Sequence, residues 1–362
     1  MKTIDNYNEK YNELTRQLLK QFSKNKENLV ISPLSILILL CMAADSVTGA
    51  GKDEIVKVIC KDLSYEEVKQ TIKELTEVPD GETLAIGNAL ALDESFEKFI
   101  KEEYKEKLLA DYKAEIFASA DLINEINNWV KEKTEGMIER LADDSLKGLC
   151  ACLMNAVCFS AEWDESYNED DIKPMTFNNA DGTTSEVDSL FGKEHRYIKN
   201  ENYEGFIKQY KDGKYSFMAL LPKQSSYEDL NVLLEDIDFT EIYRNGIDTP
   251  VKALIPEFRY DFSENMNDFL KDKGIITIFT PKADFSLMSE KQLYVSSIIH
   301  KAHIELDRKG TKAAAATGMM LFTSVAPNMS IIPLIILNRP FIYAIMHNET
   351  GLPVFTGITA KL

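Results

Sequence analysis

Histidines and cysteines are the residues of this chain most suited to chemistry, and there are few of them. The four histidines are at positions 195, 300, 303 and 347. His300, His303 and Glu305 lie close together in the sequence and suggest a metal site. Along a strand, however, His300 and His303 point to opposite faces. We therefore expect one buried and one exposed histidine there, and no metal site.

The five cysteines and the missing catalytic motifs also argue against an enzyme. Cys150, Cys152 and Cys158 would lie on the same face of a strand, as a metal cluster would need. We expect instead that these three, like Cys41 and Cys60, are small buried thiols, and we expect no disulfide framework. The sequence lacks a Gly-x-Ser-x-Gly motif, a Walker loop, a Gly-x-Gly-x-x-Gly motif and a His-Glu-x-x-His motif. We predict neither catalytic residues nor a cofactor.

The most informative segment is 310–333, GTKAAAATGMMLFTSVAPNMSIIP, which is uncharged apart from Lys312. It has no helical period, and a structureless loop of about 20 residues inside a compact domain is usually functional. Small side chains occupy alternate positions, at Thr311, Ala313, Ala315 and Thr317, so they would share one face if the segment became a strand. The segment therefore reads as a loop that can become a buried strand.

Helices and strands must hold this loop in place. Along the chain, sequence signals for helices come first and signals for strands follow. Apolar residues from Tyr7 to Phe22 fall at helical spacing, and Ser32 with Pro33 marks the start of a buried helix. Further signals are a capping box at Ser64-x-x-Glu67, a strand over 83–92, a long helix from Ile123 to Leu141, an apolar central strand over 149–159, and a hairpin turn at Asp212-Gly213. This order indicates an α+β fold.

Several motifs resemble those of the serpins, the serine-protease inhibitors that insert a cleaved loop into their own β-sheet. The segment from His300 to Thr311 with the following alanines is similar to the serpin hinge. The other matching motifs are Ile31 to Ser35, Asn127-x-Trp129 with Thr134 and Gly136, Asn155-Ala156 with Phe159 and Trp163, Ala283 to Ser286, Asn338 to Phe341, and Phe355-x-Gly357. The resemblance extends from about residue 8 to the C-terminus.

The resemblance implies a single serpin domain over residues 1–362, with three β-sheets, eight or nine helices and a reactive-centre loop at about 310–333. It also implies a metastable fold that acts as a suicide substrate of serine proteases, not as an enzyme. Its hinge would be Gly310, Thr311, Ala313, Ala314, Ala315, Ala316 and Thr317. Its sheet-opening cluster would be Ser32, Ser35, Asn155, His300 and Trp163.

The scissile bond has two candidates. Counting from Gly310 by the family's spacing gives Ser324-Val325, whereas counting back from Asn338 gives Met329-Ser330. An inserted segment ending at Ser324 spans roughly 46 Å, close to the diameter of about 53 Å for a globule of this size. An end at Met329 gives roughly 63 Å and places Pro327 in the strand. We favour Ser324-Val325.

Side chains near that bond predict the target protease. Thr323, Ser324, Val325 and Ala326 are small and suit an elastase-like or subtilisin-like protease, whereas Leu321, Phe322 and Met329 suit a chymotrypsin-like one. Two residues depart from the inhibitory pattern, because Arg308 and Lys312 stand where glutamate is frequent. The alternative function is a non-inhibitory serpin that acts as a binding, carrier or chaperone-like protein.

The formal net charge of −18 excludes the basic patch that nucleic-acid binding needs. The stretch from Ser64 to Leu75 mixes glutamates with Lys69 and Lys73, so we do not expect heparin binding. There is no apolar run of membrane-spanning length and no signal peptide. We expect a monomer without membrane contact, extracellular after removal of a signal peptide, or alternatively cytoplasmic. Asn328 and Asn348 lie in formal glycosylation sequons.

Overall fold

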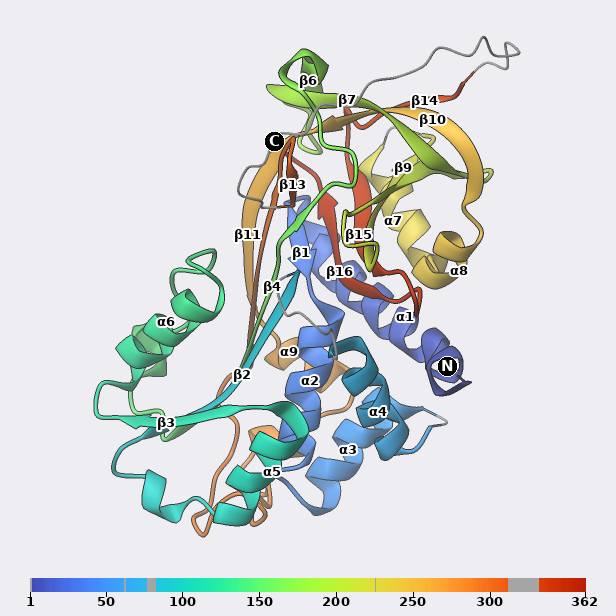
Figure 1. The fold of residues 1–362 in the computed structure, drawn as a ribbon. Helices are drawn as coiled ribbons and strands as arrows, with labels where there is room; N and C mark the ends of the chain where they lie inside the picture. Colours follow the sequence, from blue (N-terminus) through green and yellow to red (C-terminus); the bar gives the residue numbers. More distant parts are fainter. Residues whose placement is uncertain (1, 62, 77–82, 225, 312–331) are drawn as a thin grey trace. The chain divides into compact units, whose positions relative to one another are not determined.

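A computed structural model describes residues 2–61, 63–76, 83–224, 226–311 and 332–362. Figure 1 shows the helices and strands of the described chain, which groups into two compact units. The first unit comprises Met1–Gln21, Val30–Cys158 and Asp261–His303, and the second comprises Phe22–Leu29, Phe159–Tyr260 and Ile304–Leu362. Each unit therefore combines segments that are far apart in the sequence, and each is described separately below.

Nine α-helices lie within the described residues, and seven of them, α1 to α6 and α9, belong to the first unit. The nine are α1 (Lys2–Phe22), α2 (Pro33–Ala44), α3 (Gly49–Cys60), α4 (Tyr65–Thr76), α5 (Glu102–Tyr112), α6 (Leu122–Lys133), α7 (Tyr227–Asp236), α8 (Phe239–Arg244) and α9 (Asn267–Asp272). Among these helices none is both long and apolar enough to cross a membrane.

The described strands form three sheets, as predicted. They are β1 (Leu29–Ile31), β2 (Leu84–Asp93), β3 (Glu115–Ser119), β4 (Ala151–Phe159), β5 (Ala161–Glu162), β6 (Ile172–Asn178), β7 (Thr184–Lys199), β8 (Tyr203–Gln209), β9 (Tyr215–Pro222), β10 (Ile247–Pro256), β11 (Phe258–Asn265), β12 (Ile299–Leu306), β13 (Gly310–Thr311), β14 (Leu334–Ile336), β15 (Phe341–His347) and β16 (Pro353–Thr359). The strand orders are β1-β16-β15-β9-β8-β7-β10-β14 with β6 on β7, β11-β12-β13-β5, and β3-β2-β4.

Local signals predicted most element starts correctly. The apolar face of α1 is buried at Tyr7, Tyr11 and Leu18. The Ser32 side chain accepts a hydrogen bond from the Ser35 backbone N–H at the start of α2, with Pro33 as its first residue. The predicted hairpin also forms, since β8 and β9 pair in antiparallel register around Asp212 and Gly213.

Three predictions from the sequence were wrong. The long helix ends at Lys133 and not at Leu141, because the chain turns through positive φ at Glu135 and Gly136. His303 is buried like His300 and not exposed, because both faces of β12 are covered there, as the burial of its neighbours Ala302 and Ile304 shows, and its Nδ1 lies 2.7 Å from Asp261 Oδ1 on β11. Cys150 is exposed, so not every thiol is buried.

Candidate functional site

Four of the predicted sheet-opening residues form one hydrogen-bonded cluster in the first unit. The Ser32 backbone N–H donates to His300 Nε2 at 3.3 Å, which joins the start of α2 to β12. The Ser35 hydroxyl donates to Asn155 Oδ1, which joins α2 to β4. A few such bonds hold strands together at little net free energy, because each of them can be exchanged for another partner. The geometry therefore suits a place where a sheet opens.

Two residues that the sequence did not predict extend this cluster. Asn155 Nδ2 donates to Asn88 Oδ1 on β2 at 2.6 Å, and Asn88 Nδ2 donates to the Tyr112 carbonyl at 2.7 Å. Asn88 is a buried amide in an otherwise apolar strand, and that contrast is the signal that could have identified it. The network thus runs from β12 through α2, β4 and β2 to the end of α5.

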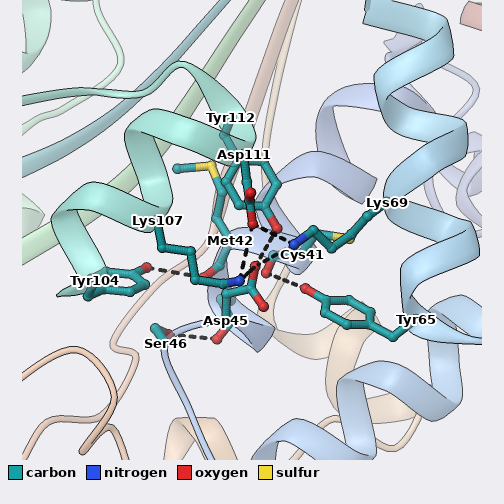
Figure 2. Close-up of polar contacts among 11 residues, drawn as sticks. Cys41, Met42, Asp45, Ser46, Tyr65, Lys69, Tyr104, Lys107, Asp111 and Tyr112 are labelled. Atoms are coloured by element: carbon teal, nitrogen blue, oxygen red, sulfur yellow. Dashed lines mark hydrogen bonds and ion pairs between the residues drawn. The ribbon is translucent and has the colours of Figure 1, made fainter.

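Beyond Tyr112 the polar contacts continue into a cluster at the C-terminal end of α2 (Figure 2). The Tyr112 hydroxyl donates to Asp45 Oδ2 at 2.8 Å, and Lys69 and Lys107 lie 3.5 and 3.6 Å from the same oxygen. Both lysines also contact Asp111, at 2.5 and 3.1 Å. Burial opposes ionisation of Asp111, but the two lysines outweigh it and lower its pKa. The two lysines are therefore neutralised by two aspartates.

Acid is expected to weaken the cluster around His300. Burial lowers the pKa of His300 to about 4, from 6.5 when exposed, so the unfolded chain binds the proton first as the pH falls. The contribution of His300 to stability is complete above pH 6.5 and is lost between pH 6.5 and 4, by about 3 kcal/mol in total. Denaturant unfolding at several pH values measures this loss, and a His300→Gln variant should lack it. An equal acid dependence in wild type and variant would contradict the expectation.

The start of the predicted hinge lies between two strands of the second unit. Thr311 on β13 pairs with Leu306 on β12 and with Ala161 on β5. Its side chain is 2% exposed, and its hydroxyl lies 2.7 Å from that of Tyr210. A Cβ on Gly310 would meet the Ala161 carbonyl oxygen at 1.9 Å, so only glycine allows this close approach. The first two hinge residues are thus already part of the sheet.

Trp163 stands beside this hinge, in the second unit, and not in the cluster of the other four predicted residues. Its indole stacks on Tyr210 with a centroid distance of 4.6 Å, and its Nε1–H donates to the Asp307 carbonyl at 3.0 Å. Arg308, the departure from the family pattern, has acidic partners. Its backbone N–H donates to Glu257 Oε1 at 3.0 Å, and its guanidinium lies 3.5 Å from Glu169.

An apolar cavity lies beside β4 in the first unit. In the described strand order, β4 pairs with β2 alone, and β12 meets β13 only at Leu306. The cavity has a volume of about 310 Å³ and is lined by Ala151 to Asn155 of β4 and Ile299 of β12, together with residues of α2, α6 and the segment 285–298. A strand at the edge of a sheet beside an apolar cavity is suited to receive an extended segment.

The remaining predicted site residues lie outside the described residues. These are the hinge residues from Ala313 to Thr317 and both candidate scissile bonds, Ser324-Val325 and Met329-Ser330. Their assignment as hinge and reactive bond stays a prediction.

Comparison with known proteins agrees with this architecture. A family model described as "Serpin (serine protease inhibitor)" matches residues 9–361, so the chain belongs to the serpin family. Serpin-Z10 of Arabidopsis thaliana is 29% identical over 388 residues, which cover 98% of this chain and 97% of that protein. The native state of tengpin, a thermophilic serpin, is 32% identical with a TM-score of 0.88, over 98% of this chain and 94% of that one. The predicted serpin fold is confirmed.

The same fold also occurs in a protein that binds a small molecule. Thyroxine-binding globulin in complex with thyroxine superimposes with a TM-score of 0.85 at 23% identity, over 98% of each chain. At that identity the likeness shows the fold alone. The fold alone therefore does not separate protease inhibition from the binding of a small molecule, and the hinge and the loop of this chain must decide between them.

Proposed function

We propose that this serpin is a suicide-substrate inhibitor of serine proteases. The observation that carries the proposal is the position of Gly310 and Thr311, which already lie as β13 between β5 and β12. Further insertion would add the residues that follow Thr311 to a sheet that the hinge has already entered. The apolar cavity that Ala151 to Asn155 of β4 line would take up part of such a strand.

The proposed sequence of events uses the protease's own chemistry. The protease serine attacks the carbonyl carbon of the reactive bond and forms an acyl-enzyme, while the amine side of the loop leaves with a proton. The acylated loop then inserts behind Thr311 as a new strand and carries the protease with it. Hydrolysis is prevented if insertion distorts the protease before water attacks the ester. The driving free energy is that of the added strand.

The reactive bond and the target remain proposals from the sequence. We propose Ser324-Val325 as the bond, with Met329-Ser330 as the alternative. The small residues on both sides favour an elastase-like or subtilisin-like target, and a chymotrypsin-like one would use the alternative bond. The net charge of −18 would attract a cationic protease at low salt.

We propose that inhibition needs no sulfated polysaccharide. On α4, Lys69 contacts Asp45 and Asp111 and is therefore not available to a polyanion, as Figure 2 shows. The first turn of the same helix carries Glu66 and Glu67, which would repel a polyanion.

The protein is further proposed to be an extracellular monomer. Asn348 is an unfavourable glycan site, because its side-chain amide donates to the Gly213 carbonyl and accepts from Tyr243.

Incubation with an elastase and a chymotrypsin-type protease tests the function. We expect a covalent complex that survives denaturing electrophoresis, together with a released peptide that begins at Val325. A peptide that begins at Ser330 would keep the function and move the bond. Cleavage without any complex would contradict inhibition and favour the carrier function.

A further inference from the structure

A buried ion pair lies next to the hinge of the second unit. Lys208 on β8 and Glu194 on β7 are 5% and 3% exposed, and Lys208 Nζ lies 3.3 Å from both carboxylate oxygens. Both contacts are long for charge-assisted hydrogen bonds, which are usually shorter than 3 Å. Replacing such a pair by apolar residues is often neutral or stabilising. Stability alone is therefore a weak reason for its presence.

The ion pair also contacts two aromatic side chains. Lys208 Nζ lies 4.5 Å from the centre of the Tyr167 ring and 5.3 Å from that of Trp163, within the range of cation–π attraction. The Tyr167 hydroxyl donates to Glu194 Oε1 at 2.9 Å. The two charges thus restrain both aromatic side chains.

The same two aromatic residues hold the turn that precedes the hinge. The Trp163 backbone N–H donates to the Lys309 carbonyl at 2.8 Å, and that of Tyr167 donates to the Arg308 carbonyl at 3.0 Å. The Trp163 indole donates to the Asp307 carbonyl. All three consecutive carbonyls of the turn are therefore bound by Trp163 or Tyr167.

We propose that Lys208 and Glu194 are positioning residues for loop insertion. They hold Trp163 and Tyr167, which in turn fix the turn from Asp307 to Lys309, so that insertion proceeds from Gly310 onward. This inference rests on the proposed inhibitory function. Without the pair the turn loosens, insertion slows, and a larger share of the acyl-enzyme is hydrolysed.

The test compares wild type with Glu194→Gln/Lys208→Met, which removes both charges together and leaves an acceptor for the Tyr167 hydroxyl. Lys208→Arg keeps the cation and should restore wild-type behaviour. Lys361→Met is the matched control, because Lys361 is an exposed lysine whose ion pair with Asp181 lies at the surface. The measurements are the melting temperature, amide hydrogen exchange at Trp163 and Tyr167, and the ratio of cleaved to complexed serpin with the elastase.

In the double variant we expect a melting temperature close to that of wild type, and exchange at the Trp163 and Tyr167 amides faster by on the order of tenfold. The ratio of cleaved to complexed serpin should rise by a similar factor. Unchanged exchange, or an unchanged ratio, would overturn the inference. If wild type forms no complex with any protease, the proposed function fails instead, and hydrogen exchange still decides whether the pair positions the turn. If the double variant does not fold, Lys208→Met and Glu194→Gln are measured singly by the same exchange experiment.

Discussion

Thr311→Arg is expected to convert the protein from an inhibitor into a substrate. Thr311 is 2% exposed between β5 and β12, so an arginine there must either bury an unpaired guanidinium or stay outside the sheet. Burying an unpaired charge costs several kcal/mol. We expect the arginine to keep this residue outside the sheet of the intact protein, so that insertion must then bury it. A cost of about 3 kcal/mol at that step slows insertion roughly a hundredfold, so hydrolysis of the acyl-enzyme wins. Denaturing gels with the target protease should show cleaved serpin and almost no complex.

The matched control for this change is Thr311→Val. Valine keeps the shape and the burial of the side chain and removes only the hydroxyl contact with Tyr210, which should cost about 1 kcal/mol. This variant should still form the complex. Equal complex formation by the arginine variant and wild type would exclude insertion at Thr311 and with it the proposed mechanism.

Residues that act through their neighbours in sequence could be predicted, and residues that act through distant contacts could not. Ser32 and Pro33 mark the start of α2 because capping depends on a few adjacent residues. The predicted end of the helix at Leu141 was wrong because the apolar spacing continues past Lys133, whereas the backbone at Glu135 and Gly136 has already left the helical region. A continuing hydrophobic pattern does not by itself show that a helix continues.

The candidate site shows the same division. Ser32, Ser35, Asn155 and His300 could be proposed through family motifs, and the structure joins them by hydrogen bonds. Asn88, Lys208 and Glu194 carry no motif. Lys208 and Glu194 lie on different strands, and only the folded sheet brings their charges within 3.3 Å. A buried ion pair of this kind becomes visible only when burial and pairing are both known.

Cleavage of the loop is expected to raise the melting temperature by about 20 °C or more. A thermolysin-like metalloprotease serves for the cut, because it forms no acyl-enzyme and leaves the serpin free. The released segment can then add about a dozen residues as a strand between β4 and β12, with backbone bonds to both. At about 1 kcal/mol for each net hydrogen bond, the gain is on the order of 10 kcal/mol, and roughly 2 °C per kcal/mol applies to a domain of this size.

Differential scanning calorimetry of intact and nicked protein measures this shift, with nicked Thr311→Arg as the control. The melting temperature of the arginine variant should rise much less on nicking, because a charged side chain at position 311 opposes insertion of the residues that follow it. The comparison separates strand insertion from the mere relief of a strained loop, because relief alone would raise the melting temperatures of wild type and variant by the same amount. A nicked wild type that melts no higher than the intact protein would mean that the loop does not insert. The small residues of the hinge would then serve the packing of β13 alone, and the carrier function would be the better account of this serpin.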